Sequence, residues 1–203
     1  MRELADSPER YSRWLSSAVA ANTKLESLDR FYANEQTRFS FDDEEWAAEK
    51  IEKFILLCES GGQRLQLDLV ATTVRGQLQK GTFDSKLRIR LRTVLVGMLS
   101  SDPTASKEVE EQLKALAQED AANRSEYDLQ RALLYQRTQR IDLAQSMITE
   151  SNFSEIRSPQ ILQEAVEVMI GYGFLEDASE ALKVVNELLP EDVFSWDRRL
   201  TLL

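Results

Sequence analysis

The chain has 203 residues and is rich in Leu, Ala, Glu, Gln and Arg, with only seven Gly and four Pro, a balance that favours long helices over many short strands. Its net charge of -10, from 35 acidic and 25 basic residues, argues against a protein whose main task is to neutralise phosphates. A hydrophobic content of 42% is enough to bury a sizeable core. We therefore expect an all-α protein.

The sequence gives no sign of membrane insertion or export. No apolar run approaches the roughly 20 residues that span a bilayer, and the N-terminal residues lack the basic and then apolar order of a signal peptide. We expect a soluble chain without a membrane span, and the cytoplasm is favoured. A periplasmic protein, or the soluble part of a membrane-anchored one, would have the same composition and stays open.

Residues 8–34 carry the first helical pattern. Ser7 suits the N-cap and Pro8 the first helical position, where a missing N–H costs nothing. Apolar side chains then recur every three or four residues, as on a helix seam. These seam residues are Tyr11, Trp14, Ala18, Ala21, Leu25, Leu28 and Tyr32. The pattern predicts one long helix that either lies on its own domain or pairs with the same helix of a second copy.

A second helix is predicted between an acidic cluster and a glycine pair. Ser40 and Asp43 have the spacing of a capping box, and the neighbouring acids suit the positive end of the helix dipole. The helix ends at Gly61 and Gly62. Its apolar residues are Trp46, Ile51, Phe54, Ile55 and Cys58. Cys58 is the single cysteine, which excludes an internal disulfide and indicates a buried structural thiol.

Residues 63–100 alternate in places like a strand, yet both halves carry an apolar stripe at helical spacing. We predict a helical hairpin that turns at the sequence KGTFD, with Asp84 as the cap of its second helix. A fifth helix follows at residues 106–121. Its inward-facing residues are Val109, Leu113 and Leu116.

A repeat is visible near the C-terminus. Four pairs of positions keep their side-chain character at an offset of 34 residues. The pairs are Tyr135 and Met169, Ile141 and Leu175, Ala144 and Ala178, and Ile148 and Leu182. The same frame starts two successive units at Ser125 and Pro159. A small residue such as Ala178 allows two helices to cross closely, because large neighbours can then interlock around it.

The repeat resembles the tetratricopeptide repeat (TPR) family, whose unit is two antiparallel helices with small residues where they cross. In the unit 159–192, Gly173 matches the family's glycine between the helices, and Ala178 matches its small residue. Leu182 matches the family's large apolar position, and Pro190 matches its terminal proline. These four matches stand in one register.

The neighbouring units match the family less fully. The unit 125–158 keeps the family's residue types at Ala132, Tyr135 and Ala144. It has Gln139 where the family has glycine and Ile156 where the family has proline. A partial unit, 193–203, has Trp196 at the family's early tryptophan position. It stops after one helix, which either caps the stack or belongs to a natural protein that continues; the apolar residues left uncovered favour continuation.

The 34-residue frame does not extend upstream of Ser125. We therefore divide the chain into a helical N-terminal region, residues 1–124, and TPR-like repeats, residues 125–203. The N-terminal region consists either of degenerate helical hairpins or of a separate, irregular helical domain. For the repeats, the resemblance implies antiparallel hairpins that stack as a right-handed α-solenoid.

In the TPR family, the first helices of successive units line a groove that binds a protein or peptide. By resemblance, the groove residues here are Leu129, Leu133, Gln136, Arg137, Gln163, Glu167 and Ile170. They lack the Lys, Arg and Asn set with which some family members hold a C-terminal carboxylate, so chaperone tails of that kind are not expected. The resemblance implies a non-enzymatic scaffold or adaptor with a protein or peptide partner.

The sequence offers little for catalysis. It has no histidine, the commonest general base near neutral pH and the usual zinc ligand, and no phosphate-binding loop, GxSxG, CxxC or EF-hand motif. We expect no enzyme, no cofactor and no metal site. The alternative function is structural, in a homodimer that self-associates through the helix 8–34.

One basic stretch is the only candidate for nucleic-acid binding. It comprises Arg75, Lys80, Lys86, Arg88, Arg90 and Arg92. Acidic segments flank it on both sides, and only Phe83 could stack on a base. We expect this stretch to pair with the acidic helix 42–59 instead.

Overall fold

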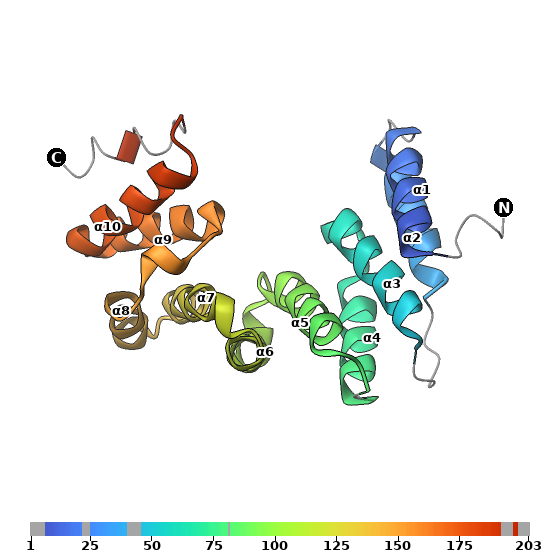
Figure 1. Ribbon diagram of the computed structural model, residues 1–203, viewed down its shortest axis with the longest axis horizontal. Coiled ribbons are helices and arrows are strands. Elements are labelled where there is room, and N and C mark those ends of the chain that lie inside the picture. Colours follow the sequence, from blue (N-terminus) through green and yellow to red (C-terminus); the bar gives the residue numbers. More distant parts are fainter. Residues whose placement is uncertain (1–6, 22–24, 40–45, 81, 192–196, 199–203) are drawn as a thin grey trace. The chain divides into compact units, whose positions relative to one another are not determined.

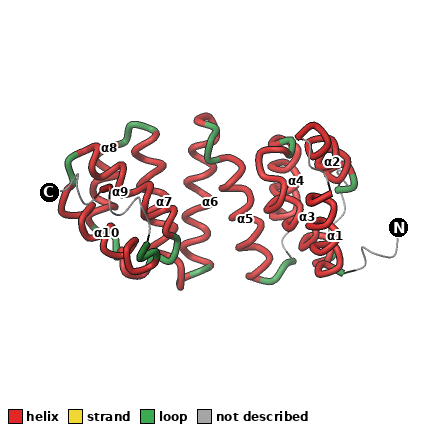
Figure 2. The backbone as a smooth tube through the Cα atoms, turned by 90° about the horizontal axis from the view of Figure 1, so that it is seen from above, coloured by secondary structure: helices red, strands yellow, loops and turns green. Residues whose placement is uncertain are grey.

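The computed structural model describes five stretches of the chain, residues 7–21, 25–39, 46–80, 82–191 and 197–198. Within these stretches the chain forms ten α-helices (Figure 1), and no strand is present in them (Figure 2). The prediction of an all-α protein is confirmed. The chain divides into two compact units, residues 1–101 and 102–203, which are described separately.

The first unit contains five helices that pack mostly against near neighbours in the sequence. They are α1 (Pro8–Ala21), α2 (Leu25–Thr37), α3 (Ala48–Gly61), α4 (Leu67–Lys80) and α5 (Ser85–Leu99). The helix α3 packs against both α1 and α5, and α4 packs against α5. The predicted hairpin is confirmed as α4 and α5, and Asp84 caps α5 by accepting a hydrogen bond of 2.8 Å from Leu87 N.

The prediction of one long helix over residues 8–34 is wrong. The helices α1 and α2 instead lie against each other. Trp14 of α1 is beside Phe31 of α2, with ring centroids 5.6 Å apart. Tyr11, one turn earlier, donates a hydrogen bond of 3.5 Å to Glu35, one turn later. An earlier residue of α1 thus contacts a later residue of α2, which shows that the two helices are antiparallel. A seam with regular spacing satisfies its apolar face equally well when its two halves cover one another.

An aromatic cluster joins the elements of the first unit. The ring of Phe39 lies 5.4 Å from Phe54, 6.0 Å from Trp46 and 6.2 Å from Tyr11, measured between centroids. All four side chains are buried, and edge-on and tilted contacts of this kind add to the stability gained by burial. Phe39 therefore links Tyr11 of α1 to Phe54 of α3 and to Trp46, which precedes α3. The predicted cap at Ser40 and Asp43 lies outside the described residues.

The end of α3 is fixed by a close approach from α2. Tyr32 donates a hydrogen bond of 3.0 Å to the carbonyl of Ser60. A Cβ atom at Gly61 would lie only 2.9 Å from both Tyr32 Cδ1 and Leu65 Cγ, so the position requires glycine. Gly61 ends α3, as predicted, and here the glycine serves packing as well as helix termination.

The second unit contains the helices α6 (Ser106–Glu119), α7 (Arg124–Arg137), α8 (Ile141–Thr149), α9 (Pro159–Tyr172) and α10 (Leu175–Leu188). The helix α7 packs against α6, α8 and α9, and α9 packs against α10. The fifth predicted helix is confirmed as α6, with its three inward residues buried. Although α6 falls within the predicted N-terminal region 1–124, it packs against α7 and belongs to this unit.

The helix pairs α7–α8 and α9–α10 turn in the same way. Gly173 has a φ of 77°, and Gln139, which stands 34 residues earlier, has a φ of 62°. Arg140 N donates to Tyr135 O, and Phe174 N donates to Met169 O, each over 2.8 Å. Both sets of contacts form a Schellman motif, which ends a helix with a residue in the left-handed conformation. Gln139 is the only non-glycine residue with a positive φ in the described stretches.

The second helices of the two pairs also bury matching positions. Ala144 of α8 and Ala178 of α10 are 2% and 0% exposed, and the larger Ile148 and Leu182 are 0% and 3% exposed. Small and large residues thus occupy the same places in the two helix pairs. Of the predicted partial unit 193–203, only residues 197 and 198 lie within the described part.

A hydrogen-bond network around Glu110 ties α6 to the turn after α7. The Glu110 carboxylate accepts bonds of 2.8 Å from both Tyr135 Oη and Arg140 Nη1, and it also accepts one from Lys114. Burial acts to raise the pKa of Glu110, but the bonds from Lys114, Arg140 and Tyr135 outweigh it and lower the pKa to about 2. The guanidinium of Arg140 also lies 4.2 Å from the Tyr135 ring centre.

The two left-handed residues give a matched pair of predictions. Replacing Gln139 with Gly should raise the free energy of unfolding by about 1 kcal/mol, since it removes the crowding of a side chain at positive φ. Replacing Gly173 with Ala should lower it by about 1 kcal/mol for the same reason. Urea denaturation of both variants measures the two changes. Equal effects of the same sign would contradict a shared left-handed turn.

The Glu110 network makes stability depend on pH. Because the folded pKa lies below the unfolded value of 4.5, the network contributes fully above about pH 4.5, and this contribution is lost as the pH falls towards 2. Replacing Glu110 with Gln should lower the free energy of unfolding by about 2 kcal/mol at pH 7 and by much less at pH 2.5. Denaturation curves at both pH values measure this, with Glu111→Gln as the exposed control on the same helix.

Candidate functional site

Two of the predicted groove residues do not face solvent. Leu129 is 0% exposed and Leu133 is 2% exposed, and both belong to the apolar cluster that also contains Leu162 and Val166 of α9. The reason is that α9 packs against α7 and covers the face that carries these leucines. Their placement in an open groove is corrected here, since a partner could reach them only if the core opened.

The other five predicted groove residues reach the surface of the second unit. Arg137 and Glu167 are exposed, whereas Gln136, Gln163 and Ile170 are partly exposed. Gln136 at the end of α7 donates a hydrogen bond of 3.3 Å to the hydroxyl of Tyr172 at the end of α9. The C-terminal ends of α7 and α9 therefore lie side by side. Glu167 accepts a hydrogen bond of 2.6 Å from Arg198 Nε.

These five residues form what we call the repeat surface: Gln136, Arg137, Gln163, Glu167 and Ile170. The surface carries one positive and one negative side chain, two amides and one apolar side chain. Such a mixture suits hydrogen bonding and ion pairing with a polypeptide better than binding of a strongly charged ligand. Tyr172, which is 39% exposed, adds an aromatic ring next to it.

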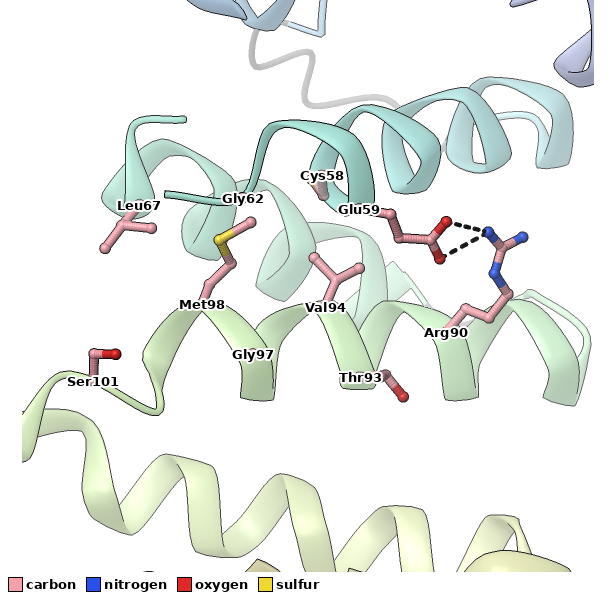
Figure 3. Close-up of a pocket in the computed structure, with 10 residues that line it drawn as sticks. All are labelled: Cys58, Glu59, Gly62, Leu67, Arg90, Thr93, Val94, Gly97, Met98 and Ser101. Atoms are coloured by element: carbon pink, nitrogen blue, oxygen red, sulfur yellow. Dashed lines mark hydrogen bonds and ion pairs between the residues drawn. The ribbon is translucent and has the colours of Figure 1, made fainter. Parts of the chain in front are cut away.

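A cavity of about 640 Å³ opens in the first unit, between α3 and α5 (Figure 3). Its lining residues are Cys58, Glu59, Gly62, Leu67, Arg90, Thr93, Val94, Gly97, Met98 and Ser101. Arg90 and Glu59 face one another at one end, and Leu67 and Ser101 lie at the other. Val94 and Met98 project from α5 towards α3 between these ends. The cavity is thus apolar in its middle and charged at one end.

The charged end of the cavity is an ion pair. Arg90 Nη2 donates to both carboxylate oxygens of Glu59, at 3.0 and 3.2 Å. The predicted pairing of the basic stretch with the acidic helix is confirmed for this residue. Cys58 lies next to Glu59, and burial, with a smaller contribution from the Glu59 charge, raises the pKa of its thiol to about 12. The thiol is therefore neutral near pH 7, as expected of a structural cysteine.

Nothing in the sequence marked this cavity. Its lining comes from the end of α3, the start of α4 and one face of α5, and α5 is separated from the first two by the rest of α4. The clearest local signal was Gly97, a glycine inside a helix whose interior otherwise favours side chains. The periodicity of apolar residues reports side chains that are present, so it cannot predict an empty space beside a glycine.

The described residues contain no group of three or more Cys, Asp and Glu side chains that could hold a metal ion. No helix in the same stretches is both long and apolar enough to cross a bilayer. The chain matches no protein-family model, no curated protein and no solved structure.

The buried thiol gives a chemical prediction. Because Cys58 is 2% exposed and its pKa is about 12, the folded protein should react negligibly with Ellman's reagent at pH 8 within minutes. The same protein in 6 M guanidinium should release about one equivalent of the coloured thiolate. Absorbance at equal protein concentration measures both. Immediate reaction of the folded sample would contradict the burial of this side chain.

Proposed function

We propose that the protein is a non-enzymatic scaffold or adaptor with TPR-like repeats, and that it binds a protein or peptide through its repeat surface. The observation that carries this proposal is the shared turn at Gln139 and Gly173. Two helix pairs that match in register, in turn conformation and in their buried small residues support a repeated unit. Stacked units of this kind present their first helices, here α7 and α9, along one surface.

The repeat surface has the side chains that such recognition requires. Arg137 and the neighbouring Tyr172 are of the types that contribute most to protein interfaces, and Glu167 supplies the opposite charge. Ile170 packs partly against the core, so its remaining exposed surface is held in a fixed position. A fixed apolar side chain on a surface that also carries charges of both signs favours a peptide with one apolar anchor and charged residues of both signs.

Self-association through residues 8–34, the other function that the sequence suggested, gains no support from the contacts. Tyr11 and Tyr32, the first and last residues of that seam, are 3% and 2% exposed, so both already pack inside the first unit. Enzymatic activity is not proposed, because the chain has no histidine and the Glu110 carboxylate is held by structural partners.

The proposal is tested by selecting peptides from a displayed random library on the parent protein. Their dissociation constants are then measured by fluorescence polarisation against two charge-reversal variants, Arg137→Glu and Glu167→Lys. We expect each variant to weaken binding about fivefold or more, because it replaces a complementary charge at the interface with a repulsive one.

Matched variants on α10 control for net charge and folding. Lys183→Glu and Glu180→Lys reverse exposed charges outside the repeat surface, and we expect them to change the affinity less than twofold. If the library gives no binder, or if all four variants bind the selected peptides equally well, the repeat surface is not the site and the proposal fails.

A further inference from the structure

The cavity of the first unit has no role in the proposed repeat surface, which belongs to the second unit. We propose that this cavity binds an amphiphile with one apolar chain and one carboxylate group, of the medium-chain fatty acid class. The alkyl chain lies along the apolar middle of the cavity, and the carboxylate lies at the end marked by Arg90 (Figure 3). This function is additional to partner binding and independent of it.

The apolar part of the cavity fits an alkyl chain. Val94 and Met98 project into it from α5, and Leu67 borders its far end. Leu67 is 37% exposed, so its burial by a ligand would remove apolar surface from water. The volume of about 640 Å³ falls within the range of about 300 to 1,000 Å³ that is usual for small-molecule sites.

Gly97 leaves space for a ligand beside α5. It lies inside α5 and borders the cavity. A Cβ atom added there would meet no other atom within 4 Å, so the packing of the chain itself does not require glycine. Glycine inside a helix costs stability relative to alanine. Because no side chain stands at Gly97, a ligand in the cavity can approach the backbone of α5 closely.

Arg90 has hydrogen-bonding capacity for a carboxylate. A guanidinium group has five N–H donors, and within the described part of the chain Arg90 donates through Nη2 alone, to Glu59. Its Nε and Nη1 hydrogens are therefore open to a second acceptor. A carboxylate can accept a hydrogen bond from one of these two nitrogens without breaking the existing ion pair, because the planar guanidinium can hold two carboxylates in different directions.

The surroundings of Arg90 favour an anion on the cavity side. Arg90 also borders a hollow of about 410 Å³ whose lining includes Glu9, Glu52 and Arg13, so charges of both signs already stand there. In the cavity itself, Glu59 is the only acidic residue of the lining, and it is paired with Arg90. A cationic head group would have to compete with Arg90 for Glu59, whereas a carboxylate uses donors that are open.

The experiment measures binding to the full chain by isothermal titration calorimetry at pH 7.5 and below the micelle concentration. The probes are decanoate, decanol and decyltrimethylammonium, which share an alkyl chain and differ in head-group charge. We expect the parent to bind decanoate about tenfold more tightly than decanol and to bind the cation most weakly. Equal affinity for the three probes, or no binding of decanoate, would overturn the proposal.

Two pairs of variants assign the binding to this cavity. Arg90→Gln should remove the preference for decanoate over decanol, whereas Arg92→Gln, on the same helix but outside the lining, should keep it. Gly97→Leu should abolish binding by filling the cavity, whereas Gly76→Leu should retain it, since Gly76 has equally open surroundings but does not border the cavity.

Folding of each variant is checked by circular dichroism and thermal unfolding. Should Gly97→Leu fail to fold, Gly97→Ala replaces it, because its single methyl group fits the open space; it should raise the melting temperature and weaken decanoate binding severalfold. Binding that survives at Gly97 and Arg90 variants alike would place decanoate elsewhere and overturn the assignment. Loss of peptide binding at the repeat surface would leave this result unchanged.

Discussion

The fold depends on helices that are too short to be stable alone. The ten described helices have between 9 and 15 residues, a length at which isolated helices are marginal in water. Each helix is therefore held by the apolar face that it shares with neighbours. In the first unit the rings around Phe39 supply this contact. In the second unit it comes from a cluster that runs from Leu129 of α7 to Val185 of α10.

Elements with a local signal could be predicted from the sequence, and elements defined by distant contacts could not. The hairpin of α4 and α5 was predictable because Asp84 is a recognisable cap and both helices carry apolar stripes. The break between α1 and α2 was not, since the spacing from Tyr11 to Tyr32 is the same for one long helix and for a hairpin. Packing of Trp14 on Phe31 decides between them, and that contact is tertiary.

The candidate sites show the same limit. The resemblance to a family of repeats predicted a binding surface on α7 and α9, and Arg137 and Glu167 are exposed on these helices. It could not show that Leu129 and Leu133 would be covered, because that depends on how closely α9 approaches α7. The cavity beside Arg90 could not be predicted from the sequence for a different reason. A cavity forms where side chains are absent, as at Gly97, and between residues that come together only after folding.

The turn at Gln139 has a consequence for how units of this kind are counted. Glutamine has no intrinsic preference for a positive φ, so the bend there is imposed by the helices on either side and by the bonds that close the Schellman motif. The same turn can therefore form without a glycine at its left-handed position. A search that relies on the glycine as a signature would count one unit in this region where the backbone turns twice in the same way.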